Sequence, residues 1–320
     1  MIKEILIPRL KNPIFICAWP GMGEVAYKTA LFLKEALDLK VFAKLEAQSF
    51  FRPQAVIVEK GIIELPTIPA GFFYYKKFSP SDILLFLGEA QPPLEKAEDL
   101  AKEIIKYVKK FKVKMLISFA AKPEAIDHKS GSSVWISATS AKMIENFRPY
   151  SLKVLQQGQI TGLNGLILGV AKGQRIEGVC FLAEIPFYTV QIENPKATLK
   201  ILEILNDYLN LRLNLTPIIE RAKFIEEEVD KLISYIKGEI PQEGLPLSEE
   251  DIEKIKKDLA AYTKLPQSAR EKIEKLFEEA KKDISKAREL KEELDRWNVY
   301  KEYEDRFLDL FKKKKQDPGH

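Results

Sequence analysis

The stretch at residues 159–186 constrains the fold most, because it predicts a turn, a helix and a strand in one run. Gly162 and Gly165 flank Asn164 at a point where the backbone is expected to need a positive φ or a close approach, which glycine and asparagine tolerate best. The apolar side chains that follow repeat at helical spacing, and Gly173 is expected to be the C′ glycine of that helix.

An apolar run of strand length follows the helix. Residues 178–183 are typical of a strand covered on both faces. Glu184 and Pro186 stand where that strand should end. A helix that leads into a buried strand is half of a β-α-β unit, so the segment favours an α/β sheet.

The preceding residues continue this alternation of strands and helices. Strands are expected at 5–8, 13–18, 41–45, 56–58, 62–65, 72–75, 82–87, 113–117 and 133–136, and helices at 25–37, 94–111, 141–147 and 196–209. The strand pair at 62–65 and 72–75 could form a hairpin or a small antiparallel excursion. An aromatic group at residues 50–78 is either core or an oligomer interface, since aromatics are enriched in interface cores.

The charge pattern predicts two domains, 1–215 and 216–320. Charged residues occupy 49 of the first 215 positions but 49 of the last 105. Pro217 opens a series of amphipathic helices with narrow apolar stripes, which predict a coiled-coil-like all-α extension. Residues 238–246 are expected to be a linker, Ser248 to cap a helix that runs through Tyr262, and one long helix to run from Pro266 to Trp297.

Composition excludes several functional classes. The net charge of +4 is too small to favour nucleic acid or a membrane surface. Cys17 and Cys180 fall in apolar runs, so we expect buried free thiols in a reducing, cytoplasmic setting. No apolar run approaches the ~20 residues that span a bilayer. The many Lys and Glu residues are compatible with a thermophilic source.

Polar and glycine residues follow several of the expected strands. Because ligands of open α/β sheets bind outside the carboxyl ends of strands, these residues form a candidate ligand rim. The rim comprises Trp19, Gly21, Gly23, Glu24, Glu89, Ser118, Thr139, Thr161, Gly162, Asn164 and Glu184.

The turn at Trp19–Glu24 allows two interpretations. A strand, a glycine turn and a helix could cradle a phosphate at the helix N-terminus. The spacing lacks both G-x-G-x-x-G and a P-loop lysine, and Glu24 would repel an anion. The alternative is a tight turn required by close packing of the strand and the helix.

The sequence offers no convincing catalytic set and no metal or cofactor site. His128 and His320 are its only histidines, so a Ser-His-Asp triad or a histidine metal cluster has little to draw on. Glu24, Glu89 and Glu184 would act as paired acid and base only if the fold brought them together.

Several of these motifs together resemble the proteasome assembly chaperone 2 family. The motifs are TGLNGLILG and EGVCFLAEIPFY within residues 161–188, the turn at 16–24, the Phe-Arg-Pro triplet at 51–53, and Gly-Glu-Ala-Gln-Pro at 88–92. The resemblance covers about residues 1–215.

The resemblance implies a three-layer α/β/α core like that of purine nucleoside phosphorylases and self-assembly into a trimer or larger ring. For some members it implies chaperone activity in proteasome assembly, often through a C-terminal hydrophobic-Tyr-any motif. Residues 316–320 depart from that motif, which puts docking of this kind in doubt.

Two functions follow as expectations. The first is a non-enzymatic, homo-oligomeric assembly or scaffold protein whose C-terminal helices bind a protein partner. The second is an enzyme or binder of nucleotide or phosphate that uses the rim. A pocket lined by converging polar groups would favour the second.

Overall fold

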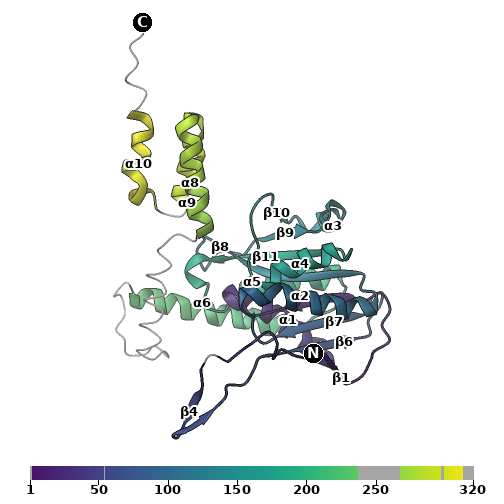
Figure 1. Ribbon diagram of the computed structural model, residues 1–320. Coiled ribbons are helices and arrows are strands. Elements are labelled where there is room, and N and C mark those ends of the chain that lie inside the picture. Colours follow the sequence, from purple (N-terminus) through teal and green to yellow (C-terminus); the bar gives the residue numbers. More distant parts are fainter. Residues whose placement is uncertain (1, 54, 237–266, 297–298, 313–320) are drawn as a thin grey trace. The chain divides into compact units, whose positions relative to one another are not determined.

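The computed structural model describes residues 2–53, 55–236, 267–296 and 299–312 (Figure 1). The chain divides into two compact units. The first comprises Met1–Lys122, His128–Ile185 and Thr189–Glu228, and the second comprises Pro123–Asp127, Pro186–Tyr188 and Val229–His320. The predicted linker at 238–246, the predicted cap at Ser248 and residues 316–320 all lie outside the described residues.

A nine-stranded mixed sheet is the centre of the first unit. From one edge, the pairs β1–β3, β3–β6 and β6–β7 are antiparallel, whereas the pairs β7–β2 and β2–β8 are parallel. At the other edge β9 is antiparallel to β11 and parallel to β10. The order is β1 (Ile2–Glu4), β3 (Lys40–Glu46), β6 (Ala70–Lys76), β7 (Ile83–Gly88), β2 (Ile14–Ala18), β8 (Met115–Glu124), β11 (Gly178–Pro186), β9 (Val134–Ala138), β10 (Lys153–Val154).

Helices pack on this sheet and complete a mixed α/β fold, as the sequence predicts. They are α1 (Val25–Ala36), α2 (Leu94–Val108), α3 (Ala141–Asn146), α4 (Leu163–Gly173) and α5 (Pro195–Tyr208). Helices α2 and α4 contact each other, and so do α1 and α5.

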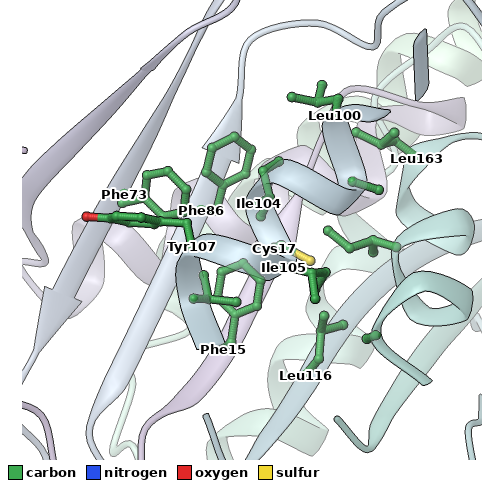
Figure 2. Close-up of a cluster of buried hydrophobic side chains, with 14 of the residues drawn as sticks. Phe15, Cys17, Phe73, Phe86, Leu100, Ile104, Ile105, Tyr107, Leu116 and Leu163 are labelled. Atoms are coloured by element: carbon green, nitrogen blue, oxygen red, sulfur yellow. The ribbon is translucent and has the colours of Figure 1, made fainter. Parts of the chain in front are cut away.

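The main core lies between the sheet and helices α2 and α4. Phe15 and Cys17 of β2 point toward Ile104 and Ile105 of α2 (Figure 2). Alternate residues of a strand point to opposite faces. The buried residues of α1, such as Leu33, do not belong to this cluster, and α1 contacts β2 and β7 separately.

Two expectations about the organising stretch are confirmed. Gly162 has φ +77°, and a side chain at Gly165 would meet the Ile160 carbonyl oxygen at 2.4 Å, so both positions need glycine. Every residue of β11 is buried, as expected for a strand covered on both faces. The two cysteines are also buried and free.

Three local predictions are wrong. Gly173 is the last residue of α4, and the left-handed residue that follows the helix is Arg175, with φ +60°. The first strand lies at residues 2–4 instead of 5–8, because the N–H groups of Ile5 and Leu6 both donate to the Phe42 carbonyl oxygen and end the ladder.

The third wrong prediction is that the strand at 113–117 gives way to a loop at Ser118. Strand β8 continues to Glu124. Phe119 and Ala121 are buried and alternate with the half-buried Ala120 and Lys122, which is the period of a strand.

The second unit contains α8 (Gln267–Lys282), α9 (Ala287–Arg296) and α10 (Tyr300–Lys312), so the described part of the C-terminal region is helical, as expected. The three helices share a small core that includes Phe277, Leu290 and Phe307. The single long helix predicted from Pro266 is interrupted, because the side chain of Asp283 accepts a hydrogen bond from the Ser285 N–H and starts a new turn.

Candidate functional site

The carboxyl end of β2 is held to the start of α4 by one asparagine side chain. The Trp19 N–H donates to Asn164 Oδ1 at 3.0 Å, and Asn164 Nδ2 donates to the Trp19 carbonyl oxygen at 3.1 Å. Asn164 is buried, so these bonds satisfy polar groups that burial would otherwise leave unpaired. The asparagine therefore pairs with Trp19 as a neighbouring strand residue would.

Gln91 makes a second bridge at the same place. Its Nε2 donates to the Pro20 carbonyl oxygen at 2.6 Å, and its Oε1 accepts from the Leu163 N–H at 2.8 Å. Asn164 and Gln91 thus join three segments far apart in the sequence, at residues 19–20, 91 and 163–164. We call this set of hydrogen bonds the strand-end clasp.

Glycines at the clasp leave room for its large side chains. A side chain at Gly88 would lie 2.3 Å from the Trp19 indole ring, and one at Gly162 would lie 2.7 Å from Gln91 Oε1. Gly21 faces Asn164 and Gln91 at ordinary van der Waals distances. Close packing around the clasp therefore explains why Gly88 and Gly162 in these motifs are glycines.

The turn before α1 has the geometry of a tight connection. Gly23 has φ +59°, its N–H donates to the Val190 carbonyl oxygen at 2.7 Å, and its own carbonyl oxygen accepts from the Asn194 N–H at 2.8 Å. Glu24 is exposed and forms an ion pair with Lys28 at 3.3 Å. These contacts favour the packing interpretation over a phosphate cradle.

Glu89 continues β7 past its last strand residue. Its side chain accepts a hydrogen bond from the Ala70 N–H at 2.8 Å, and its own N–H donates to the Ala70 carbonyl oxygen at 2.9 Å. The carboxylate therefore caps the start of the adjacent strand β6.

Glu184, near the end of β11, belongs to a separate polar cluster with residues of β9 and the edge strand β10. Its Oε1 accepts from Trp135 Nε1 at 2.6 Å and from Lys153 Nζ at 2.9 Å. Burial would raise the pKa of Glu184, but these hydrogen bonds and the Lys153 charge hold that pKa below its ordinary value. Lys122 lies over the Trp135 ring at 4.4 Å.

Ser118 and Thr139 are not beside the clasp. Ser118 is fully buried within β8, next to Cys180. Thr139 exchanges hydrogen bonds with Gly178, the first residue of β11, whereas Glu184 lies near the end of that strand. Because β9 is antiparallel to β11, Thr139 and Glu184 lie at opposite ends of β11.

The structure therefore brings together only part of the predicted rim. Trp19, Gly21, Gly162 and Asn164 meet in the clasp. Thr161, which is exposed, directly precedes Gly162 in the chain. Gln91 belongs to the clasp but not to the candidate rim, although it lies in the motif at 88–92, because nothing in a single sequence shows which side chains will meet.

A pocket of ≈ 200 Å³ lies beside helices α1 and α5. Lys28, Glu193, Thr198 and Arg221 are among its lining residues, and no clasp residue is. Glu193 pairs with Lys28 at 3.5 Å and with Arg221. Burial alone would lower the pKa of Lys28, but the carboxylates of Glu193 and Glu24 have the larger combined effect, so the pKa of Lys28 is raised above its ordinary value. Glu193 thus forms ion pairs with both Lys28 and Arg221, the two cationic side chains that line the pocket.

The described residues show neither a metal-binding cluster nor a membrane-spanning helix. No group of three or more His, Cys, Asp or Glu side chains there could hold a metal ion. None of the helices in that part of the chain combines the length and apolar character needed to cross a bilayer.

The three segments that the clasp joins all lie in motifs that carry the family resemblance, and comparison with known families agrees. The model of the PAC2 family matches residues 15–233, more than half of the chain. The chain belongs to the PAC2 family. Three of its signature segments are thus parts of one hydrogen-bonded structure in this PAC2 protein.

Similar proteins cover most of its length. The Methanocaldococcus jannaschii protein MJ1210 is 26% identical over 251 residues, which are 77% of this chain and 93% of the relative. Pyrococcus furiosus PbaB, described as an archaeal proteasome activator, is 26% identical with a TM-score of 0.63 and covers 72% of this chain and 98% of its own.

Pyrococcus furiosus PbaA is described as an archaeal homolog of proteasome-assembly chaperone. It is 26% identical with a TM-score of 0.58, covering 72% of this chain and 96% of PbaA. The chain is therefore homologous to proteins of this archaeal group.

Proposed function

We propose that this PAC2 protein is a non-enzymatic assembly protein that associates with copies of itself, as a trimer or larger ring, and binds a protein partner through its C-terminal helices. The clasp is the main support. The Asn164 and Gln91 side chains form hydrogen bonds with main-chain groups that follow β2 and that start α4, where an enzyme of this fold class would direct such side chains at a ligand.

The proposal includes the three-layer core of the nucleoside phosphorylases and the separate domain at 216–320. A small hydrophobic core in the described C-terminal helices supports the second point, because helices that share a core can fold as a unit. Tyr303 stacks on Phe277 with ring centroids 5.9 Å apart. Leu308 and Phe311 are 45% and 49% exposed on α10 and offer an apolar contact surface to a partner.

The proteasome is the first partner to test, since PbaB is described as a proteasome activator and PbaA as a homolog of proteasome-assembly chaperone. Binding of this chain to a purified archaeal proteasome core particle can be measured by surface plasmon resonance. A variant that lacks residues 299–320 should bind more weakly if α10 makes the contact. Equal binding of the two chains would contradict the role given to the C-terminal helices.

The alternative function is binding of nucleotide or phosphate. The pocket beside α1 and α5 favours it only weakly, because Glu193 already neutralises Lys28 and Arg221. Light scattering after size exclusion, together with a thermal-shift screen of nucleotides, separates the two functions. An assembly whose melting temperature does not respond to nucleotide supports the scaffold, whereas a monomer that nucleotide stabilises supports the binder.

A further inference from the structure

The β4–β5 hairpin is an exposed apolar arm. Strands β4 (Ile57–Glu59) and β5 (Ile62–Glu64) pair only with each other and extend away from the nine-stranded sheet in Figure 1. The hairpin connects β3 to β6. Six large aliphatic side chains on it are 46% to 75% exposed: Val56, Ile57, Val58, Ile62, Ile63 and Leu65.

The two sides of this hairpin differ in chemistry. Val58 is paired with Ile63, and paired residues of antiparallel strands share one side. The opposite side carries the pairs Ile57 with Glu64 and Glu59 with Ile62. One side is therefore purely aliphatic between the strands, whereas the other mixes isoleucine with glutamate.

The exposed apolar side chains of this hairpin indicate that another protein surface packs against it. An isolated two-stranded hairpin is only marginally stable in water. Contiguous exposed apolar surface rimmed by polar groups commonly marks a protein contact. Among the described residues, neither Glu59 nor Glu64 forms an ion pair. The missing partner should therefore be apolar and should carry positive charge.

The outer face of β3 and β6 has this composition. Phe72 and Tyr74 are half-buried there, with ring centroids 6.4 Å apart. Lys44 lies over the Phe72 ring at 5.5 Å, and Lys34 of α1 lies over the Tyr74 ring at 5.6 Å. Val41, paired with Tyr74, is 39% exposed on the same face.

Charge complementarity favours a second copy of this chain as the partner. Two carboxylates lie near this face. Glu46 is paired with Lys3 at 2.5 Å, and Glu89, which lies near Tyr74, accepts a hydrogen bond from the Ala70 N–H. The ammonium groups of Lys34 and Lys44, which lie over the rings themselves, therefore supply the positive charge of the aromatic face. A lysine side chain is long and flexible enough to reach past the edge of a two-stranded ribbon to a carboxylate.

We propose that the β4–β5 hairpin of one copy lays its Val58–Ile63 side on the Phe72–Tyr74 face of a second copy, where Lys34 and Lys44 pair with Glu59 and Glu64. The hairpin and the face are different surfaces of one chain. Contacts of this head-to-tail kind close into a ring when the rotation between copies allows it. The inference rests on the proposed self-association and assigns its surfaces.

The first test compares the two sides of the hairpin in the full-length chain. Val58→Thr with Ile63→Thr keeps β-branched residues at exposed positions but adds hydroxyl groups to the aliphatic side. Ile57→Thr with Ile62→Thr is the matched control on the other side. In light scattering, the first variant should shift the assembly to monomer at concentrations where the wild type and the control remain assembled.

The outcomes separate this inference from the proposed function. A wild-type chain that is monomeric at all concentrations overturns both. An assembled wild type whose Val58→Thr/Ile63→Thr variant assembles equally well overturns the hairpin contact alone. Loss of assembly in that variant, with an unchanged circular dichroism spectrum and an assembled control, supports the contact.

A cross-linking experiment identifies the face without depending on assembly strength. A chain with Ile63→Cys is mixed with a differently tagged chain with Val41→Cys and treated with a short bis-maleimide. A cross-linked pair carrying both tags is expected, and at least a tenfold lower yield is expected when Ile57→Cys replaces Ile63→Cys. Equal yields from the two hairpin positions would overturn the proposed orientation.

Discussion

The Asn164 side chain forms two hydrogen bonds with the main chain of Trp19, one with its N–H at 3.0 Å and one with its carbonyl oxygen at 3.1 Å. Asn164 is the second residue of α4, whereas Trp19 directly follows β2. One side chain thus fixes a helix start against a strand end, which explains why an asparagine stands between two glycines at this point.

Asn164→Ala should destabilise the fold by about 1–3 kcal/mol, because it leaves the buried N–H and carbonyl groups of Trp19 without partners. Urea unfolding followed by circular dichroism measures the change in the free energy of unfolding. Gln157→Ala is the control, since it also removes an amide but at an exposed position. Equal stabilities of the two variants would contradict a structural role for the clasp.

Two glycines of α4 should respond in opposite directions to alanine. Gly165→Ala should lower stability by about 1–3 kcal/mol, because the added methyl group would lie 2.4 Å from the Ile160 carbonyl oxygen. Gly169 is exposed with no neighbour within 4 Å of an added methyl group. Gly169→Ala should therefore raise stability by about 0.5–1 kcal/mol through helix propensity.

Urea unfolding followed by circular dichroism measures the stability of both glycine variants, and each variant is the control for the other. A loss of stability in both would mean that the space around Gly169 is filled in the folded protein, for example by a contact with another chain.

These glycines show what local sequence chemistry can predict. Gly162 and Gly165 were predicted from the demands of one turn, and the strand at Gly178 from an unbroken apolar run. Both inferences use neighbours in sequence, so they do not depend on strand order.

The candidate rim depended on strand order, which the sequence does not contain. The antiparallel placement of β9 moves Thr139 to the opposite end of β11 from Glu184. Ser118 was expected in the loop after a strand at 113–117, but β8 continues to Glu124 and buries Phe119. Gln91 was missed for the same reason, because its two partners are 71 and 72 residues away.

Glu184 should make stability depend on pH. Its folded-state pKa is lowered, so its stabilising effect is present above its unfolded-state pKa of about 4.3 and is lost as the pH falls through the folded-state value. At pH 7, Glu184→Gln should cost about 0.5–1 kcal/mol, a small value because Lys153 is half-exposed.

The difference between the wild type and Glu184→Gln should shrink as the pH is lowered from 7 toward 3, as measured by urea unfolding at each pH. Glu98→Gln, which removes an exposed carboxylate paired with Lys102, is the control and should have a smaller effect at pH 7. A difference that grows on acidification would contradict the lowered pKa.

Truncation tests the predicted boundary at residue 215. Chains that end after Leu215 and after Glu228 should both fold, because the sheet and α1 to α5 precede both ends. The shorter chain should be less stable by about 2–3 kcal/mol, since it loses the buried side chains of Ile218 and Ala222 in α6 (Thr216–Ile236). Melting temperatures and light scattering measure both points. Two insoluble products would contradict a separate N-terminal domain.

The two thiols should resist labelling in the folded protein. Burial raises the pKa of Cys17 well above its ordinary value, and burial raises the pKa of Cys180 to about 12 against a smaller opposing effect from Ser118. The thiolate is the reactive form, so both low access and low thiolate content should slow the reaction. Ellman's reagent should therefore detect two thiols in denaturant and none on mixing with the native protein.

An introduced thiol provides the comparison for this measurement. Ile63→Cys places one thiol at an exposed hairpin position, and it should react on mixing in any chain whose hairpin is uncovered. If wild-type Cys17 or Cys180 reacted as fast as this thiol, the core between β2, β8 and β11 would be open to solvent. Protection of the Ile63→Cys thiol at high protein concentration, with its release on dilution, would show instead that a second chain covers the hairpin.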